Sequence, residues 1–528
     1  TLICVFEPNL KLLQTALEQR DFSKLIQSGR VLWFWQADKG EFFTRLSAWM
    51  SSITMGFVGI AHAPSLELDP QFHQKMQSCV EELKAYAKTS ITTLVINGKR
   101  TAENVSRNIP WYIAAPSLSR LKDRYKNQPA IIVSAGPSLR KNKHLLKDVA
   151  GNAVIIAVQT TLRPLLELGI EPHFVTSLDY HDISTRFWEN LPPTLSTELI
   201  AEPKASEAIL QRNPGPLSLL GNDFAENLLS ELKLDKTRLP SGATVAHLAY
   251  YVAEHIGCDP IIFIGQDLGF SDGLAYTPGT SYEDVWRPEL SRFCTIEMKQ
   301  WEQIVRDRHI LRQVPDQQGR PMYTEERLFT YLQHFEKDFA RTRTKIIDAT
   351  EGGVLKRGAA SMTLADAIAQ FCAQPLTTGR ISHPGMRWDL VIDSKNCLEN
   401  RRREGEQIEK ISRQTLPLLE EIRDHISDQA KVNRAIGKID VLRSRMAELG
   451  NCYTLIMQLT QKSELERFKA DRRIAAAKVS GAERQKRQIE RDIENVRSVV
   501  DAAVEFQNLM SETIAHVESF GAKHQEAA

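Results

Sequence analysis

Residues 129–139 read PAIIVSAGPSL, and this stretch decides the fold of the chain. Its first half is an unbroken apolar run of the kind that forms a buried strand of a parallel sheet. Gly136 and Pro137 then predict a tight turn, because glycine permits close approach of the backbone and proline favours the first turn of a helix. Phosphates and nucleotides bind at such strand-to-helix turns, where Ser138 would offer its hydroxyl and the neighbouring N–H groups.

Further apolar runs of strand length follow, with helix-like spacers between them. Because such runs are typical of a parallel sheet covered on both faces, we expect an α/β domain with a Rossmann-like sheet. This central domain is expected to extend over residues 101–375 and to include a Gly-rich segment, EGGVLKRGA, at 351–359. The runs are AIIVSAG, AVIIAVQ, HFVTSLD, TELIAEP, LSLLG and IIFIGQD, and a helix-rich stretch from residue 283 precedes a last run, KIIDAT.

The sequences on either side of the central domain have a different spacing of apolar residues. Residues 1–100 alternate short apolar runs, LICVF, VLWFWQ and TTLVIN, with helix-like segments, which predicts a small N-terminal α/β domain. Residues 376–528 lose the strand-like runs after Ser394 and carry apolar residues at helical spacing, which predicts an all-α C-terminal domain. Its apolar stripes must pack on one another, on the central domain or on another subunit, so a homo-oligomer formed through this tail is one expectation.

Composition restricts the class of protein and its surroundings. The 528 residues are 42% hydrophobic and 25% charged, and 67 Lys and Arg residues nearly balance 66 Asp and Glu residues. These values are typical of soluble globular proteins and predict neither a nucleic-acid nor a membrane partner. The seven cysteines are scattered without CxxC spacing, so we expect free thiols in a reducing, cytoplasmic compartment. Segment 46–66 lacks charged residues, but its polar residues and glycines favour a buried helix and turn over a membrane span.

Small and polar side chains follow several of the expected strands. Because the carboxyl ends of parallel strands meet at one edge, where open α/β sheets bind ligands, we expect these residues to surround one cleft. Asp179 and Asp267 form a pair of strand-end carboxylates that suits metal–phosphate binding or acid–base catalysis. Simpler interpretations stay open, because Ser138 and Ser241 can cap helices and both aspartates can cap turns. The candidates beyond the first turn are Gln159, Ser177, Asp179, Ser241, Gly242, Thr244, Gly265, Gln266 and Asp267.

Several common motifs are absent from the sequence. Gly136 is followed by Pro-Ser-Leu and not by the lysine of a P-loop, and no GxGxxG follows an expected strand. No HExxH pair is present either. These absences disfavour the common NTPase and dinucleotide-binding functions and a zinc site, so we expect no metal centre of that kind.

Three segments resemble the motility accessory factor (Maf) glycosyltransferases in their order and spacing. They are NQPAIIVSAGPSLRKN, IIAVQTTLRPLLELGIEPHFVTSLD and SGATVAHLAYYVAEHIGCDPIIFIGQDLGFSDG. The resemblance covers roughly residues 100–372, with Asn104 and Asn108 upstream and TYLQHFEKDF and KIIDATEGGVLKRG downstream. The α/β leader and the helical tail also resemble the three-part arrangement of Maf proteins.

Maf proteins are bacterial cytoplasmic enzymes, and the resemblance implies transfer of a nonulosonic acid, pseudaminic or legionaminic, from a CMP-activated donor to Ser or Thr of flagellin. Their core is similar to bacterial sialyltransferases of a variant GT-A fold, which invert the sugar and need no metal-binding DxD motif. The resemblance implies that Gly136 to Leu139, Ser241–Gly242 and Gly265–Asp267 surround the CMP. Tyr276 stands where Maf members usually carry a histidine. A tyrosine of the comparable sialyltransferase segment contacts the CMP phosphate, so Tyr276 is expected to steady the leaving phosphate.

Two other functions stay open. Archaeal 6-hydroxymethylpterin diphosphokinase shares the same core and would use ATP and Mg²⁺, with Asp179 and Asp267 facing the magnesium ion. A catalytically degenerate scaffold that binds flagellin is the non-enzymatic alternative. The long leader and the helical tail favour the Maf-like glycosyltransferase, with a CMP-activated sugar as donor, no firmly expected cofactor and an open question over magnesium.

Overall fold

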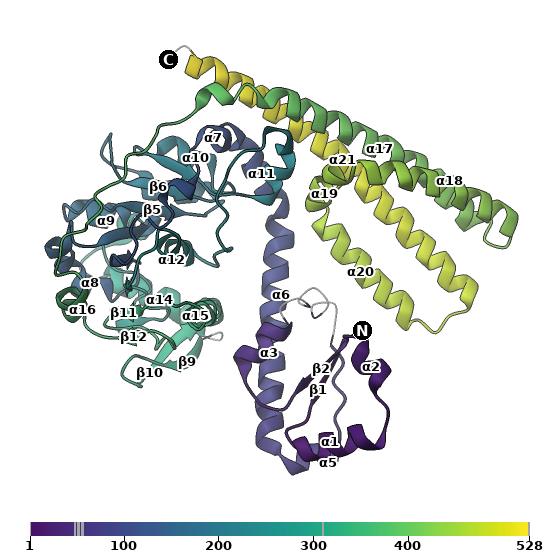
Figure 1. The fold of residues 1–528 in the computed structure, drawn as a ribbon, viewed down its shortest axis with the longest axis horizontal. Helices are drawn as coiled ribbons and strands as arrows, with labels where there is room; N and C mark the ends of the chain where they lie inside the picture. Colours follow the sequence, from purple (N-terminus) through teal and green to yellow (C-terminus); the bar gives the residue numbers. More distant parts are fainter. Residues whose placement is uncertain (1, 47–48, 50–52, 54–56, 309–310, 526–528) are drawn as a thin grey trace. The chain divides into compact units, whose positions relative to one another are not determined.

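The structure is a computed structural model, which describes residues 2–46, 49, 53, 57–308 and 311–525. Contacts divide the chain into two compact units, Thr1–Gly98 with Gln461–Arg491, and Lys99–Thr460 with Asp492–Ala528. Figure 1 shows the elements of both units. The helix and turn expected over segment 46–66 fall partly outside the described residues, which exclude 47–48, 50–52 and 54–56.

The larger unit is built on an eight-stranded sheet in which every pairing is parallel. The strand order is β12-β11-β8-β3-β4-β5-β6-β7, so the chain runs outward from β3 to β7 and returns to the other side of β3 as β8. The order therefore reverses at β3, and open α/β sheets bind ligands beyond the strand ends at such a point. The strands are β3 (Ala130–Val133), β4 (Val154–Val158), β5 (Phe174–Ser177), β6 (Glu198–Ala201), β7 (Leu217–Leu219), β8 (Ile261–Ile264), β11 (Ile346–Asp348) and β12 (Ala360–Ser361).

The apolar runs of the sequence form this sheet in the expected order. AIIVSAG contains β3, IIFIGQD contains β8 and KIIDAT contains β11, and every residue of β3, β4 and β8 is buried. Burial on both faces explains why these strands are apolar throughout instead of alternating. The α/β class and the Rossmann-like parallel sheet are therefore confirmed.

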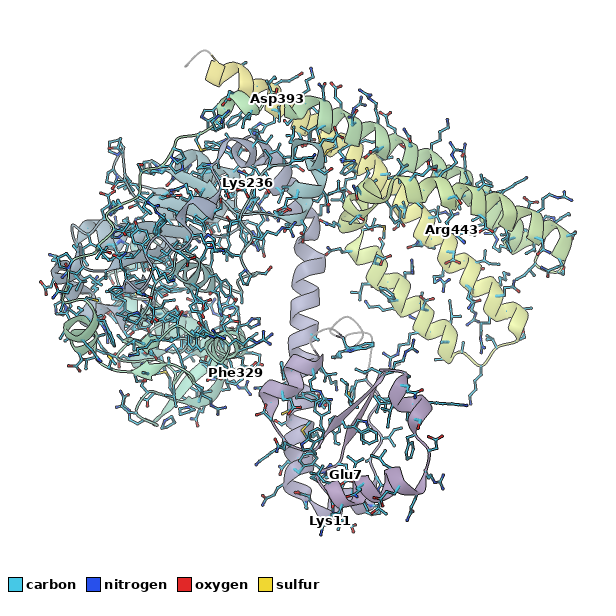
Figure 2. All side chains as sticks on the ribbon, viewed as in Figure 1. Glu7, Lys11, Lys236, Phe329, Asp393 and Arg443 are labelled. Carbon is cyan, nitrogen blue, oxygen red and sulfur yellow. The ribbon has the colours of Figure 1, made fainter. Side chains whose placement is uncertain are left out.

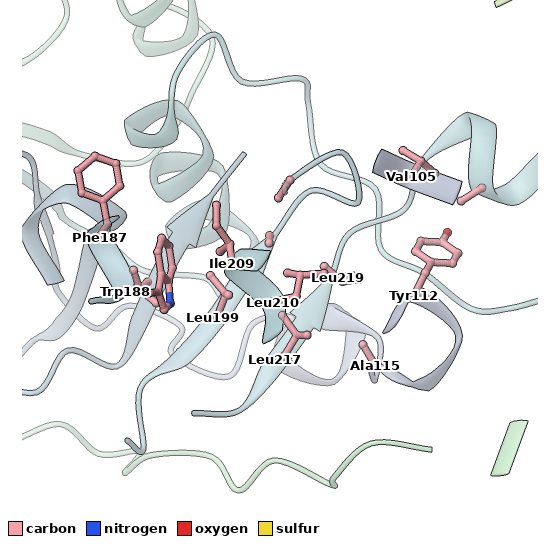
Figure 3. Packing of buried hydrophobic residues seen from close by; sticks show 14 of the residues in the cluster. Val105, Tyr112, Ala115, Phe187, Trp188, Leu199, Ile209, Leu210, Leu217 and Leu219 are labelled. Atoms are coloured by element: carbon pink, nitrogen blue, oxygen red, sulfur yellow. The ribbon is translucent and has the colours of Figure 1, made fainter. Parts of the chain in front are cut away.

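Helices cover both faces of the sheet. Ala130 and Ile132 of β3 belong to one buried apolar cluster, while Ile131 and Val133 belong to another, as the alternation of side chains along a strand requires. Figure 3 shows part of the second cluster, with strand residues packed beside Trp188. The first cluster is completed by α12 (Val245–His255) and α15 (Glu326–Phe339), and the second by α7 (Ile109–Ala114), α9 (Leu162–Glu167), α10 (Glu207–Arg212), α11 (Asp223–Leu228) and α16 (Leu364–Phe371).

The C-terminal region is helical, as its apolar spacing predicts. Within the larger unit, Arg401 of α17 donates to the Leu228 carbonyl oxygen and to Ser230 Oγ, and His516 of α21 lies 3.0 Å from Glu207 of α10. The parts of the C-terminal region that contain Arg401 and His516 therefore pack on the central sheet region, while self-association stays a prediction. Its charged faces are exposed, as Arg443 shows in Figure 2. The helices are α17 (Ser394–Asp424), α18 (Gln429–Glu448), α19 (Gly450–Leu459), α20 (Gln461–Ala476) and α21 (Gly481–Gln525).

The smaller unit contains a two-stranded parallel sheet around a small aromatic core that includes Phe34, Phe42 and Phe72. The apolar run TTLVIN, residues 92–97, was expected as a strand but lies within α6, so the helical context overrides its β-branched residues. The domain limits expected at residues 100 and 375 stay predictions. The elements are β1 (Ile3–Phe6), α1 (Leu10–Gln19), α2 (Ser23–Gln27), β2 (Val31–Phe34), α3 (Lys39–Leu46) and α5 (Ala63–Leu68), followed by α6 (Pro70–Arg107).

An antiparallel hairpin interrupts the helix-rich stretch that was expected after residue 283. It pairs β9 (Leu311–Pro315) with β10 (Pro321–Glu325) and lies between α14 (Ile296–Arg306) and α15. None of the helices in the described ranges combines the length and the hydropathy that a membrane-spanning segment needs.

Candidate functional site

A hydrogen bond and close packing hold the turn after β3 against the loop after β8, and we call this arrangement the lock. The Gly136 N–H donates to the Gly265 carbonyl oxygen at 2.7 Å. A Cβ at Gly136 would lie 2.8 Å from Asp267 Cγ and closer still to its Oδ2. Only glycine therefore permits this approach of the two loops, whereas close approach of a ligand to the backbone at Gly136 stays a prediction. Gly265 has φ +63°, and a side chain there would meet the Ser134 carbonyl group.

Three donor groups bind the Asp267 carboxylate at the centre of this lock. Ser138 Oγ donates to Oδ2 at 2.6 Å, the Ser138 N–H lies 3.3 Å from both carboxylate oxygens, and Ser271 Oγ donates to Oδ1. Asp267 is 2% exposed. Burial raises its pKa, although the bonds from Ser138 and Ser271 and the charge of Lys356 act in the opposite direction. These are the contacts of a carboxylate that fixes a loop, and its catalytic role stays a prediction.

The Gly-rich segment 351–359 forms the third side of the lock. The Gly353 N–H donates to Ser271 Oγ at 3.1 Å, and the Val354 N–H donates to the Asp267 carbonyl oxygen at 2.8 Å. Gly353 has φ +75°, and a Cβ there would lie 2.5 Å from Asp267 Cα. Glycine is therefore required at this position both by the conformation and by the space.

The turn is followed by a short helix. The helix that follows it, α8 (Leu139–Asn142), has four residues, and Ser138 makes no capping bond to it. The cap interpretation of Ser138 is therefore wrong, since its hydroxyl binds Asp267. The Leu139 side chain is buried in the core, and its N–H donates to the Gly136 carbonyl oxygen at 3.1 Å. The N–H groups that we expected to face a phosphate are bonded within the protein, and Pro137 is buried beside them.

A second group of polar residues gathers at the ends of β4 and β5. Gln159 Nε2 donates to Asp179 Oδ2, Ser177 Oγ donates to Gln159 Oε1 at 2.7 Å, and Ser184 Oγ donates to the same Asp179 oxygen at 3.0 Å. Gln159 and Ser177 are buried, whereas Asp179 is half-buried. Asp179 Oδ1 accepts no hydrogen bond from the described residues, so this carboxylate keeps an oxygen for another partner.

Tyr276 belongs to a loop that is held over the first turn. The Thr277 N–H donates to the Ala135 carbonyl oxygen at 2.9 Å, and Gln300 Oε1 of α14 accepts from the Tyr276 N–H at 3.1 Å. The Tyr276 ring stacks on Tyr282 of α13 (Tyr282–Trp286), with ring centroids 4.2 Å apart and an interplanar angle of 20°. The loop therefore places this aromatic pair beside the turn that follows β3.

The electrostatics of Tyr282 connect this pair with Asp179. Burial raises the pKa of Tyr282, Tyr276 and the Asp179 charge raise it further, and the Arg186 charge opposes them. The guanidinium Cζ of Arg186 lies 5.9 Å from the centroid of the Tyr282 ring. These contacts and charges place the residues concerned in one region, which we call the Asp179 group. Its members are Asp179, Tyr276, Tyr282, Arg186, Gln159, Ser177 and Ser184.

The start of α12 reaches this edge through Thr176. Thr176 Oγ1 donates to the Val245 carbonyl oxygen at 3.1 Å, which joins the end of β5 to the first turn of the helix. Thr244 is the cap of α12, since its Oγ1 accepts from the His247 N–H at 3.3 Å. Ser241 is therefore not the helix cap, and its side chain is exposed. A Cβ at Gly242 would lie 3.1 Å from the Leu248 N–H, so glycine suits this close turn.

Several buried polar atoms at the edge have no partner among the described residues. They are Ser134 Oγ, Gln266 Oε1 and Thr277 Oγ1, from three segments that meet at the ends of β3 and β8. Buried polar atoms are normally paired, so these three atoms could each bind a water molecule or a ligand. Gln266 was predicted from the sequence, whereas the other two were not.

Other residues of the site also escaped the sequence analysis. Ser271, Gly353 and Tyr282 have no motif of their own, although the pair of tyrosines in AYTPGTSY and the Gly-Gly of EGGV are signals that could have been read. Asn104 and Asn108, in contrast, have structural roles, since their side-chain amides donate to the carbonyl oxygens of Lys204 and Ala205.

Asp179 and Asp267 are the carboxylates that a metal ion could use at this edge. An ionised carboxylate has about four acceptor positions, and three donor groups, Ser138 Oγ, the Ser138 N–H and Ser271 Oγ, bind that of Asp267. Within the described ranges, no three His, Cys, Asp or Glu side chains are grouped so that they could hold a metal ion. Since Mg²⁺ is often held by one or two carboxylates together with substrate phosphates, a magnesium ion at either aspartate stays a prediction.

Comparisons with known proteins agree with the resemblance that the sequence indicates. Residues 103–273 match the family of 6-hydroxymethylpterin diphosphokinase MptE-like proteins, and this range contains β3 to β8 and Asp267. The structure is similar to that of the MAf glycosyltransferase from Magnetospirillum magneticum AMB-1, with a TM-score of 0.56 and 14% identity over 98% of this chain and 78% of that chain. No curated protein matched the sequence. The chain thus has a Maf-like fold with an MptE-like core.

Proposed function

We propose that the protein is a glycosyltransferase that moves a nonulosonic acid from a CMP-activated donor to Ser or Thr of flagellin in the cytoplasm. The observation that carries this proposal is the meeting of the β3 turn and the β8 loop where the strand order reverses, with the Asp179 group at the ends of β4 and β5 along the same edge of the sheet. The similarity to a Maf glycosyltransferase supports the reaction class, and the resemblance of the sequence supports the donor and the acceptor.

In the proposed reaction, the acceptor hydroxyl oxygen attacks the anomeric carbon while the bond from that carbon to the CMP phosphate oxygen breaks. The electron pair of that bond leaves with CMP, and the hydroxyl proton passes to the Asp179 carboxylate, whose Oδ1 accepts no bond from the described residues. Attack on the face opposite to the leaving group inverts the configuration. Tyr276 would donate to the leaving phosphate, where the negative charge develops.

The lock around Asp267 has a different role in this proposal. It holds the Gly136–Ser138 turn and the Gly265–Gln266 loop at a fixed separation, and the unpaired Gln266 Oε1 and Ser134 Oγ would bind the nucleotide beside it. Asp267 is then a positioning residue, because it acts on the donor through the turn. Preorganised polar groups lower a barrier only if they do not have to move during the reaction, which is what such a lock provides.

A second candidate is an ATP- and Mg²⁺-dependent 6-hydroxymethylpterin diphosphokinase, which the family match over residues 103–273 favours. The three donor groups of Ser138 and Ser271 that bind Asp267 oppose it, because they compete with a magnesium ion for that carboxylate. A flagellin-binding scaffold is the third. It would bind flagellin and not CMP, so calorimetric titrations with each of them separate it from the enzyme.

The proposal is tested by mass spectrometry of flagellin that is co-expressed with this protein and a pathway for a CMP-activated nonulosonic acid. We expect the mass of one or more such sugars on Ser or Thr with the wild-type protein and unmodified flagellin with Asp179→Asn. Asp182→Asn is the matched control, because this exposed aspartate lies three residues away. Unmodified flagellin with the wild-type protein, together with Mg²⁺-dependent turnover of ATP and hydroxymethylpterin, would select the second candidate.

A further inference from the structure

Arg186 belongs to the Asp179 group but has no part in the reaction proposed above. It belongs to the 3-10 helix Asp182–Trp188 that follows β5, and its guanidinium lies at the Tyr282 ring. Its Nε–H donates to the Ile183 carbonyl oxygen at 3.0 Å, and its own carbonyl oxygen accepts from Ser281 Oγ at 3.3 Å. One hydrogen bond therefore holds the side chain at Nε, and a second holds the backbone of Arg186.

The two Nη groups of the Arg186 guanidinium bind no partner among the described residues. Among the described residues, no carboxylate lies within ion-pair distance of Arg186, and its Nη1 and Nη2 groups donate no hydrogen bond. Arg163, from the neighbouring part of the same edge, contrasts with it, since it pairs with Asp284 at 3.1 Å and with Glu167 at 3.8 Å. With Nε bound to Ile183, the two Nη groups form a planar fork, which is the geometry that binds a carboxylate in a bidentate manner.

Arg186 is also half-buried, so its lack of an anionic partner carries a cost in desolvation. Asp179 is the carboxylate of the same group, and one of its oxygens is engaged by Gln159 and Ser184. Arg186 lies at the Tyr282 ring and the Asp179 charge acts on the same tyrosine, so an anion site and a proton acceptor both neighbour Tyr282. A substrate that carries a negative charge next to its reacting carbon would satisfy both.

We propose that Arg186 binds the carboxylate of the donor sugar through its two Nη groups and so selects an acidic nine-carbon sugar over a neutral hexose. This inference rests on the function proposed above. A nonulosonic acid carries its carboxylate on the anomeric carbon, so a bound carboxylate at Arg186 places that carbon beside Asp179. The carboxylate stays on the sugar throughout the transfer, and Arg186 therefore contributes to donor binding in the ground state and not to proton transfer.

The test is calorimetric binding of CMP and of CMP-activated pseudaminic or legionaminic acid to the full-length wild-type protein and to Arg186→Gln. We expect Arg186→Gln to bind CMP within about 2-fold of wild type, but to bind the CMP-activated acid roughly 10- to 100-fold more weakly, because a charge-assisted pair is lost. Arg186→Lys should recover only part of the loss, since lysine has no planar fork. Arg212→Gln is the matched control, because this exposed arginine of α10 lies 3.8 Å from Glu189 and outside the site.

A second probe keeps the test independent of folding. The methyl ester of the donor carboxylate should bind wild type as weakly as the free acid binds Arg186→Gln, and the substitution should not weaken binding of the ester further. Equal binding of the free acid by wild type and Arg186→Gln would overturn the role of Arg186 while leaving the glycosyltransferase in place. If the wild-type protein binds neither CMP nor the CMP-activated acids, the proposed function fails, and this inference fails with it.

Discussion

The two aspartates that end strands of the sheet, Asp267 and Asp179, have the same chemistry but different surroundings. Asp267 is buried and is bound by three donor groups of Ser138 and Ser271 that reach both of its oxygens, and burial raises its pKa. Asp179 is half-buried, and its two side-chain donors, Gln159 and Ser184, both bind one oxygen. A strand-end carboxylate can thus either build the loops of a site or face the substrate, and the difference lies in how many of its acceptor positions the protein itself uses.

The largest effect on stability is expected when a side chain is added at Gly136, because it would push apart the two loops of the lock around Asp267. Gly136→Ala would place a Cβ 2.8 Å from Asp267 Cγ, so the turn and the loop must separate. We expect the free energy of unfolding to fall by about 3 kcal/mol or more, and donor binding to be lost. Chemical denaturation and CMP titration measure the two effects.

Gly437→Ala in α18 is the control for this change, because nothing lies within 4 Å of the Cβ that it adds. It should be neutral or slightly stabilising, as alanine favours the helix. A stable Gly136→Ala protein that still binds CMP would show that the lock does not shape the site.

The second-largest effect is expected on the transfer rate, which should depend directly on the Asp179 carboxylate. Asp179→Asn keeps the size of the side chain but removes the proton acceptor, so the transfer rate should fall by roughly 10²- to 10³-fold with little change in stability. The rate is measured as sugar transferred to purified flagellin over time, with Asp182→Asn as control. If the rate falls by no more than 3-fold, on the order of 1 kcal/mol or less, Asp179 is not the general base.

Asp267 should differ from Asp179 in its contribution to the free energy of unfolding and in how that contribution depends on pH. Asp267→Ala leaves the buried donors of Ser138 and Ser271 unpaired, so the free energy of unfolding should fall by about 2 kcal/mol while the protein stays folded, and transfer should be lost with the turn. The exposed Asp440→Ala in α18 is the control and should change the free energy of unfolding little.

The pH dependence of this loss follows from the raised pKa of Asp267. Between the ordinary aspartate pKa and the raised one, the folded protein keeps a proton that the unfolded chain releases, so the contribution of Asp267 to stability falls as the pH rises. The stability difference between wild type and Asp267→Ala should therefore shrink with increasing pH across that window. Urea denaturation at several pH values measures it, and a difference that grows instead would mean that the pKa is lowered in the folded state.

The smallest effect is expected at Tyr276. Tyr276→Phe keeps the stack on Tyr282 but removes the hydroxyl that would steady the phosphate, so kcat should fall by about 10-fold with an unchanged free energy of unfolding. Tyr323→Phe on the exposed face of the hairpin is the control. An unchanged kcat for Tyr276→Phe would limit this residue to packing.

The sheet could be predicted from the sequence because strands that are buried on both faces leave unbroken apolar runs, as β3 and β8 do. The hairpin β9–β10 was missed because its strands, LRQVP and PMYTE, mix polar and apolar residues. TTLVIN was misread because local β propensity is weaker than the helical context of α6. Both errors arise where tertiary packing, and not the local pattern, decides the structure.

The sequence predicted where the candidate site lies on the sheet, but it did not predict which side chains enclose each aspartate. Strand order brings Gly136, Asp179 and Asp267 to one edge, which the pattern of strand ends indicates. Whether an aspartate is enclosed depends on residues that are distant in the sequence, such as Gly353, whose backbone meets Asp267 only in the folded chain. No local pattern contains that information, and the same is true of the unpaired fork of Arg186.

The central claim is that this edge of the sheet binds cytidine monophosphate as the leaving group of an activated sugar. Calorimetric titration of the full-length protein with CMP, and separately with ATP in the presence of Mg²⁺, tests it directly. We expect one CMP site per chain that the CMP-activated acids also occupy, and no binding of ATP at that site. Binding of Mg²⁺–ATP without any binding of CMP would contradict the account.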